Sequence, residues 1–459
     1  MKTTRRDFIG KAAAVAGIGA LAPAAHSAPA AKRWYKGNLH MHSFWSDGKA
    51  FPEEAVLWYK SRGYNFIGLS DHNVFQDRTD RWVTVSMDGK KSGKVKRRHF
   101  DDYVKAFPDA EVRKNAKGAT VVRLRTFAEL EKRFNAPGEF LMMPNVEATR
   151  HVKYNDGVIR QLHMNYVNLP QLLDSYRKKT FRSMISGKSL EKALRDNAAE
   201  TAALAGKLGK PYLFILNHPN WAWYDVGPEA LIDNPEVRFF EVCNNGANYA
   251  PAKGMPTDGF DADRFWDVVN AFRARRGQNL LYGIGTDDTH TYNGERRQAG
   301  NSWSLVRSES LNAASLIAAM NRGDFVTCEG LEPEDVNFDA SSKTLEVSVA
   351  AKAGVSRTVR FIVSKKDFSE KPVRTIEVVP AEQKADKKRF RRSINVYDER
   401  IGVTVKSVVG KKGEPLKVSY TMASDDLYVR ARIEEDGVPL CKSPLHPQGK
   451  LVAWTQPYA

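Results

Sequence analysis

The chain has 459 residues, and at about 100–200 residues per domain this length predicts two or three domains rather than one. Hydrophobic residues make up 42% and charged residues 27%, which excludes a globally disordered chain and a membrane protein with several spans. Lysine and arginine exceed aspartate and glutamate by 71 to 54, and this net charge of +17 favours anionic partners.

The first thirty residues have the pattern of an export signal. The pair Arg5 and Arg6 precedes a weakly apolar run from Ala12 to Ala25, and small residues follow at 28–30. The arginine pair resembles a twin-arginine signal, and the apolar run is shorter than the roughly 20 residues of a membrane-spanning helix. We therefore predict a signal peptide over residues 1–30, an exported protein in the periplasm or outside the cell, and no transmembrane span in the mature chain.

From residue 31 to about residue 330, short apolar runs alternate with segments of helical period, which is typical of βα units around a parallel sheet or barrel. The seven expected strands are Lys36–Met41, Phe66–Leu69, Phe140–Val146, Leu162–Val167, Tyr212–Leu216, Arg238–Val242 and Leu280–Gly285. The expected helices are Pro52–Arg62, Thr126–Asn135, Ser189–Leu208, Ala262–Arg275 and Asn312–Asn321. The pattern predicts an α/β domain over residues 31–330.

Two segments depart from this alternation. Residues 76–125 form a basic insertion without a clean period, which predicts a solvated loop or, because it follows a strand end, a lid. After Glu332 the sequence changes to alternating strands, such as Thr344–Val349, Thr358–Val363 and Leu427–Ile433. We predict a small all-β, sandwich-like domain over residues 331–459, with a structural role.

Histidine and acidic residues fall at the ends of the expected strands. Six of the ten histidines do so, together with three acidic residues, and the set is His40, His42, Asp47, His72, Glu147, His163, His218, Asp288 and His290. Side chains at i and i+2 of a strand share a face, so His40 and His42 can hold one ion. Loops after the strands of such a barrel meet on one face, where its enzymes place their sites.

The composition of this set limits which ion it can hold. The three cysteines, Cys243, Cys328 and Cys441, are far apart and odd in number, so they supply neither a disulfide framework nor a cysteine-rich zinc site. Imidazoles with carboxylates suit Zn²⁺, Mn²⁺ or Fe²⁺, and the choice among these three stays open. The sequence therefore predicts a site for divalent metal ions.

The set resembles the polymerase-and-histidinol-phosphatase (PHP) family of metallohydrolases over about 290 residues. The motifs that carry the resemblance are His40-x-His42 with Ser46-Asp47-Gly48, Leu69-Ser70-Asp71-His72-Asn73, Glu147, His163, His218 and Asp288-x-His290. The flanks Phe140–Glu147 and Gly323–Phe325 look most like the exported, carbaryl-hydrolase-related branch of that family. The resemblance implies a distorted (β/α)7 barrel that holds two or three metal ions.

The resemblance also implies how the ions are shared. A first ion would be held by His40, His42, Glu147 and Asp288, and Glu147 would bridge to a second ion on His163 and His218. A third ion would take Asp47, His72 and His290. Asp71 precedes a ligand, and we expect it to orient His72, because metal-bound imidazoles normally have such a partner.

This site predicts hydrolysis of a small phosphoester. Metal ions lower the pKa of a bound water toward neutrality and neutralise charge on a phosphoryl group. We expect Asp288 to accept the proton of the water, and Arg150 to bind the substrate phosphate through its planar guanidinium. His151 could replace His163 if the fourth strand is misplaced.

Three other interpretations stay open. The same water could open a carbamate or carboxylic ester, since the residues do not separate carbon from phosphorus as the electrophile. A nuclease is less consistent with the sequence, which shows no aromatic and basic strand motif for stacking bases, and we expect no stable nucleic-acid partner. The third interpretation is a non-catalytic metal-binding module at the cell surface.

Overall fold

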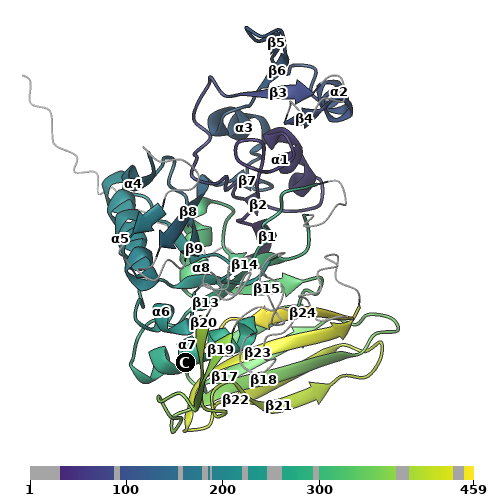
Figure 1. The fold of residues 1–459 in the computed structure, drawn as a ribbon. Coiled ribbons are helices and arrows are strands. Elements are labelled where there is room, and N and C mark those ends of the chain that lie inside the picture. The colour runs from purple at the N-terminus through teal and green to yellow at the C-terminus, as the bar shows by residue number, and fades with distance from the viewer. Residues whose placement is uncertain are drawn as a thin grey trace, which may run out of the picture. The chain divides into compact units, whose positions relative to one another are not determined.

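The computed structural model describes residues 31–86, 94–153, 159–177, 184–186, 189–219, 226–244, 261–292, 299–378, 392–437 and 449–459 (Figure 1). The predicted signal peptide, residues 1–30, lies outside them. The described chain is mixed α/β, and most of its strands belong to two large sheets. Among the described residues, no helix combines the length and the apolar character needed to cross a membrane.

Each of the seven predicted apolar runs contains a strand. The first large sheet includes three neighbouring parallel strands, β1 (Arg33–Asn38), β2 (Phe66–Ile67) and β7 (Leu141–Met142). The second has the order β10-β8-β9-β11-β12-β13, formed by Met184–Ser186, Asn145–Lys153, Ile159–Val167, Leu213–Leu216, Phe239–Cys243 and Tyr282–Gly285. Branched and aromatic residues in these short runs favour strands, and nearly all of their side chains are buried.

The expected barrel of seven strands is not closed in the described chain. The sheet breaks between β7 and β8, where Pro144 has no N–H to donate to a neighbouring strand. In the second sheet β9 runs antiparallel to both β8 and β11, and only five residues, 154–158, separate β8 from β9 in the sequence. The strand prediction is therefore confirmed run by run, whereas the predicted distorted (β/α)7 barrel is not seen, and the described strands of this region lie mainly in two sheets.

The five predicted helices are present within one or two residues of their expected ends. They are α1 (Pro52–Lys60), α3 (Phe127–Phe134), α5 (Leu190–Leu208), α7 (Ala262–Arg275) and α8 (Ala313–Asn321). Side chains of Thr126, Ser189, Asp261 and Asn312 accept hydrogen bonds from backbone N–H groups in the first turns of α3, α5, α7 and α8. Short helices α4 (Asp174–Arg177) and α6 (Pro228–Ile232) complete this part of the chain.

The basic insertion is folded where the structure describes it, so the prediction of a solvated loop is wrong there. Strands β3 (Trp82–Ser86), β4 (Val95–Lys96), β5 (Val112–Lys114) and β6 (Thr120–Arg123) form a small sheet with α2 (Arg97–Ala106). Alternating valines of β3 and the ring of Tyr103 are buried, and the Tyr103 hydroxyl donates to Glu53 Oε1 of α1 at 2.8 Å. This alternation of buried and exposed residues covers only a few positions, so it is hard to recognise in a sequence that contains many charged residues.

The last third of the chain extends the first sheet. Strands β14 (Trp303–Ser308) and β15 (Phe325–Glu329) continue it into β24 (Lys450–Thr455), β23 (Asp426–Asp436), β18 (Arg357–Lys365) and β21 (Val403–Val409), and the last of these lie side by side in Figure 1. A separate three-stranded sheet packs against β23 and β18 of the first sheet. It consists of β16 (Asp335–Asp339), β17 (Thr344–Val349) and β22 (Leu416–Thr421). Strands β19 (Arg374–Val378) and β20 (Arg392–Val396) pair antiparallel as a separate two-stranded sheet. The sandwich-like packing agrees with the sequence pattern, and the domain boundary at residue 330 stays a prediction.

Candidate metal centre

The nine predicted ligands meet in one place: Glu147 and His163 lie within β8 and β9, and the other seven lie in segments that follow strands. Each of them has a nitrogen or carboxylate oxygen within 4.0 Å of another member of the set, and Glu147 of β8 is the common neighbour of five histidines. Two isolated backbone bridges, Met41 to Thr289 and His72 to Glu147, hold the segments together where the sheets do not pair. The break between the sheets therefore does not separate the site residues.

The first group consists of His40, His42, Glu147 and Asp288. The two histidine Nε2 atoms are 3.2 Å apart, and each lies 3.3 Å from Glu147 Oε2. Asp288 Oδ1 lies 3.3 Å from His40 Nε2 and 3.1 Å from His42 Nε2. Two ligand atoms of a tetrahedral Zn²⁺ site, each about 2.0 Å from the ion, lie about 3.3 Å apart, so the triangle of the two Nε2 atoms and Glu147 Oε2 has the size of one face of such a site.

The second group uses the other oxygens of the same two carboxylates. His163 Nδ1 lies 2.9 Å from Glu147 Oε1. His218 Nε2 lies 3.7 Å from Glu147 Oε1 and 4.0 Å from Asp288 Oδ2. Glu147 and Asp288 therefore each turn one oxygen toward the first group and the other toward the second. His163 is the histidine placed here, so the alternative assignment to His151 is not needed.

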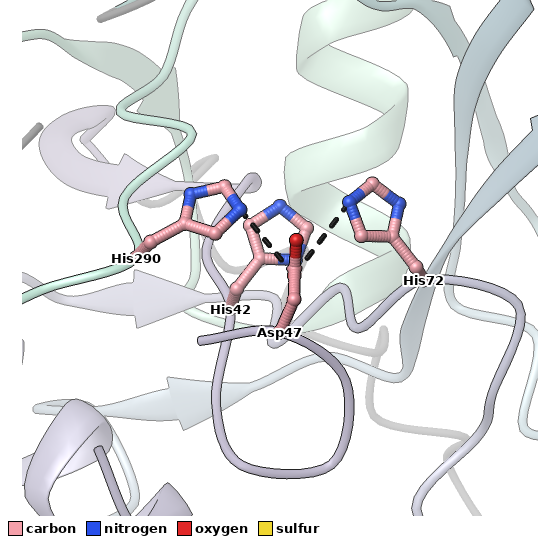
Figure 2. A group of neighbouring side chains, drawn as sticks. All are labelled: His42, Asp47, His72 and His290. Atoms are coloured by element: carbon pink, nitrogen blue, oxygen red, sulfur yellow. Dashed lines mark ion pairs between the residues drawn. The ribbon is translucent and has the colours of Figure 1, made fainter. Parts of the chain in front are cut away.

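The third group is more open and contains Asp47, His72 and His290, with His42 between the two histidine rings (Figure 2). Asp47 Oδ1 lies 3.3 Å from His290 Nε2 and 3.7 Å from His72 Nε2. Asp47 is half exposed, whereas the three histidines are largely buried. His42 Nδ1, 3.9 Å from Asp47 Oδ1, is buried and has no hydrogen-bond partner among the described residues. A buried nitrogen without a hydrogen-bond partner is consistent with a site that binds a cation.

The electrostatics of the cluster suit a cation. Burial opposes ionisation of Glu147 and Asp288, yet the surrounding imidazoles hold the pKa of both carboxyls well below the usual range. Burial, together with His290 and His72, lowers the pKa of His42 to about 4. Burial also disfavours a charged His40, but nearby carboxylates raise the pKa of His40 well above its ordinary value. Ionised carboxylates and imidazoles that can lose a proton are the forms that metal ions bind.

Polar side chains around the cluster hold its loops. Asn73 pairs with the backbone of Thr149 in β8, and Asn217 Nδ2 donates to Glu147 Oε1 at 3.0 Å. The Tyr292 hydroxyl donates to the His42 carbonyl at 2.8 Å. These three residues, each next to a predicted ligand in the sequence, fix the backbone or a carboxylate of the site.

Asp71 has a different role from the one expected. Its carboxylate accepts hydrogen bonds from the backbone and hydroxyl groups of Ser43 and Ser46 and from Gln76 Nε2, at 2.7–3.1 Å. His72 Nδ1 instead lies 2.8 Å from Glu147 Oε2 and 2.7 Å from Thr149 Oγ1. Asp71 thus holds the loop that carries Asp47 rather than the ring of His72.

Arg150 does not lie in the cluster. Glu147 and Thr149 of β8 face the histidines, and because side chains alternate along a strand, Arg150 faces the other way. Its guanidinium donates to the Tyr176 hydroxyl at 2.8 Å and to Ser175 Oγ, and it stacks on the Tyr176 ring. The expected contact of Arg150 with a substrate phosphate is therefore corrected to a packing contact with α4.

One buried acid of the site was missed in the sequence. Glu241 lies in β12 and is completely buried, with Oε1 2.6 Å from His40 Nδ1. It is not next to a histidine in the chain, and its signal is a single charge inside the apolar run Phe239–Cys243. A buried charge in a strand calls for a partner, and this rule could have found it.

No family model and no curated protein matches this sequence. Among solved structures, similarity is found to a two-domain protein from Bacteroides vulgatus that contains a predicted PHP-like metal-dependent phosphoesterase, at 16% identity over 92% of this chain and 95% of that one, with a TM-score of 0.36. A candidate metal-dependent phosphoesterase from Bifidobacterium adolescentis is 11% identical over 56% and 87% of the two chains, with a TM-score of 0.30. An amidohydrolase from Chromobacterium violaceum is 12% identical over 55% and 87%, with a TM-score of 0.26. At this distance, function has to be argued from the chain's own residues.

Proposed function

We propose that this protein is a metal-dependent phosphoesterase that acts on a small phosphorylated substrate. The observation that carries the proposal is the convergence of six imidazoles and three carboxylates, with the Nε2 atoms of His40 and His42 and Glu147 Oε2 only 3.2–3.3 Å from one another in the first group. A buried cluster of this composition is costly unless a cation compensates it. The sequence motifs independently resemble those of the PHP family.

The three groups would hold two or three divalent ions, Zn²⁺, Mn²⁺ or Fe²⁺. The first group would bind through the Nε2 atoms of His40 and His42 with Glu147 and Asp288, and the second through His163, His218 and the second oxygen of Glu147. Asp47, His72 and His290 would hold the third. When bound, such ions activate water at neutral pH and neutralise charge on a phosphoryl group.

The chain's own residues supply positioning and proton transfer. Asp288 lies between the first two groups and the surrounding histidines hold its pKa well below the usual range, so its carboxylate would be placed to accept a proton from water there. Asp288 adopts φ +47°, a strained conformation for a non-glycine residue, which aims its carboxylate back between the histidines. The basic surplus of the chain would attract an anionic substrate to the half-exposed third group.

A panel of substrates tests the reaction class. Protein of measured metal content, loaded with Zn²⁺, Mn²⁺ or Fe²⁺, is offered a nitrophenyl phosphate, its phosphodiester and an aryl carbamate at equal concentration. We expect the phosphate esters to be hydrolysed faster than the carbamate. Faster turnover of the carbamate would favour an ester or carbamate hydrolase, and no turnover by metal-loaded protein would favour a non-catalytic module.

The Asp47 loop offers a test of the third group. A Cβ atom on Gly48 would lie 2.4 Å from the Ser43 backbone nitrogen and 2.5 Å from the His42 carbonyl carbon, so Gly48→Ala must push the loop away. We expect this variant to bind about one metal ion fewer per chain, because Asp47 moves with the loop. Elemental analysis of the purified protein measures it.

Gly206→Ala is the matched control, since this glycine of α5 has open space around its Cβ position. We expect full metal content, with a slight gain in stability of about 0.5–1 kcal/mol from the better helix former. Equal metal content in the Gly48 and Gly206 variants would argue against a third ion at Asp47.

We further propose that the chain is an exported member of the PHP family, related to the carbaryl-hydrolase branch, with its two sheets corresponding to a PHP barrel opened between β7 and β8. The sequence motifs and the strand-end ligands support the family. Export would use the twin-arginine signal, which carries proteins already folded around their metal. Replacing Arg5 and Arg6 by lysine and locating the protein by cell fractionation tests the export route.

A further inference from the structure

We propose that Glu241 is a positioning residue of this centre: its carboxylate fixes the ring of His40 and the backbone of His218, one ligand from each of the first two groups. The inference rests on the proposed function, because it assigns Glu241 a role toward the metal ions of that site. It concerns a residue outside the sequence motifs quoted above.

The carboxylate of Glu241 is surrounded by four donors from four segments. Oε1 lies 2.6 Å from His40 Nδ1 and accepts from Thr286 Oγ1 at 2.6 Å. Oε2 accepts from the His218 backbone N–H at 2.9 Å and from Asn244 Nδ2 at 2.6 Å. Glu241 is completely buried, so water does not compete for these bonds.

The contact with His40 decides which ring nitrogen is free. An ionised carboxylate can only accept hydrogen bonds, so Nδ1 of His40 must carry the proton that it donates to Oε1. The lone pair is then left on Nε2, which is the atom that faces His42, Glu147 and Asp288 at 3.2–3.3 Å. A carboxylate behind a metal-binding imidazole fixes both the ring orientation and the tautomer in this way.

The contact with His218 holds a strained backbone. His218 has φ +23°, in a region that non-glycine residues seldom adopt and that is kept only when surrounding contacts enforce it. The bond from its N–H to Glu241 Oε2 is such a contact. One side chain of β12 therefore connects the histidine after β1 with the histidine after β11, and it couples the first group to the second.

A glutamine of the same size cannot replace this carboxylate. Each oxygen faces two donors, and an amide keeps only one acceptor oxygen. If the amide NH2 faces His218 and Asn244, three hydrogen-bond donors face one another without an acceptor. If it faces His40 instead, Nδ1 becomes the acceptor and the proton moves to Nε2, where it blocks metal binding.

Zinc titration of metal-free protein tests the proposal. Zn²⁺ alone is added to the wild-type protein, Glu241→Gln and Glu435→Gln in competition with a chromophoric chelator. Glu435 is the matched control, because it is an equally buried strand carboxylate that is bonded to Arg357 at 2.9 Å. We expect about 10–100-fold weaker zinc binding in Glu241→Gln, the usual range for such partners, and no change in Glu435→Gln.

Thermal unfolding of the metal-free proteins separates positioning from plain destabilisation. A Glu241→Gln variant that melts like the Glu435 control but binds zinc more weakly supports positioning. Equal zinc affinity of Glu241→Gln and the wild type overturns it. If Glu241→Gln does not fold, ¹⁵N NMR of histidine-labelled, zinc-loaded wild-type protein decides instead. Zinc on Nε2 of His40 with a proton on Nδ1 supports the proposal, and the reverse overturns it.

A failure of the role proposed for Glu241 can be distinguished from a failure of the proposed function. A wild-type protein that binds no zinc and hydrolyses no phosphoester would contradict the proposed function itself. A wild-type protein that does both, beside a Glu241→Gln variant with the same zinc affinity, would contradict only the role of Glu241.

Discussion

Glu147→Gln is expected to lose activity by at least about 10³-fold in kcat, a loss like that of a central charge-stabilising group. Glu147 Oε2 contacts His40 and His42 of the first group, and Oε1 contacts His163 of the second. A neutral amide removes the negative charge that both groups share. The variant should therefore bind fewer ions, and elemental analysis should show this loss beside the loss of turnover.

The Glu435→Gln variant is again the control, because it removes a buried carboxylate outside the cluster. We expect it to keep both activity and metal content. Chelation of the wild-type protein should reproduce the inactivity of Glu147→Gln, and added Zn²⁺, Mn²⁺ or Fe²⁺ should restore activity only to the wild type. A Glu147→Gln protein with full turnover would contradict the site.

Arg430→Met is expected to lower the free energy of unfolding by about 3–5 kcal/mol, the range for breaking a buried ion pair by removing one partner. Arg430 of β23 is completely buried, and its guanidinium donates to both oxygens of Asp267 in α7 at 2.8 and 2.6 Å. The variant leaves Asp267 buried and charged, with the Tyr428 hydroxyl at 2.7 Å as a remaining donor. Urea unfolding of the metal-free protein measures the loss.

Arg430 Nη1 also lies 2.9 Å from Asp263 Oδ1, and Asp263 keeps Arg432 as a partner at 2.7 Å when Arg430 is replaced. The double variant Arg430→Met with Asp267→Leu should therefore recover part of that stability, since apolar side chains replace one of the two buried ion pairs of Arg430. Arg78→Met is the surface control, because the pair of Arg78 and Asp80 is exposed on both sides and we expect no measurable change. If Arg430→Met unfolds at the same urea concentration as Arg78→Met, the pair does not join α7 to β23 as argued.

More of the candidate site than of the sheet arrangement could be predicted from the sequence. Each predicted ligand lies in an apolar run or within six residues after one, and the ends of such runs meet even when their pairing is irregular, as the bridge between His72 and Glu147 shows. Whether the strands close into a barrel depends instead on pairing between distant segments. In this chain Pro144 lies where the first sheet ends and β8 pairs with β9 as an antiparallel neighbour, and neither feature changes the hydrophobic period of the sequence.

Two residues mark what the strand pattern leaves open. Arg150 lies three residues after Glu147, which is close in the chain but on the opposite face of β8, so it packs on Tyr176. Glu241 is about 200 residues from His40 and reaches it only because β12 lies beside the site. Distance along the chain is therefore a poor guide for both residues: Arg150 is close to a ligand in sequence but lies outside the cluster, whereas Glu241 is far from His40 in sequence but contacts it.

The sequence alone determined where the seven apolar strands and five helices of residues 31–330 lie and which nine ligand-type residues meet, because periodic burial and strand ends are local properties of the chain. Only the tertiary structure decided which oxygen of Glu147 faces which histidine, that Asp71 holds the Asp47 loop, and that Glu241 stands behind His40. These are contacts between distant segments, and they depend on the direction of each side chain, which no local pattern encodes.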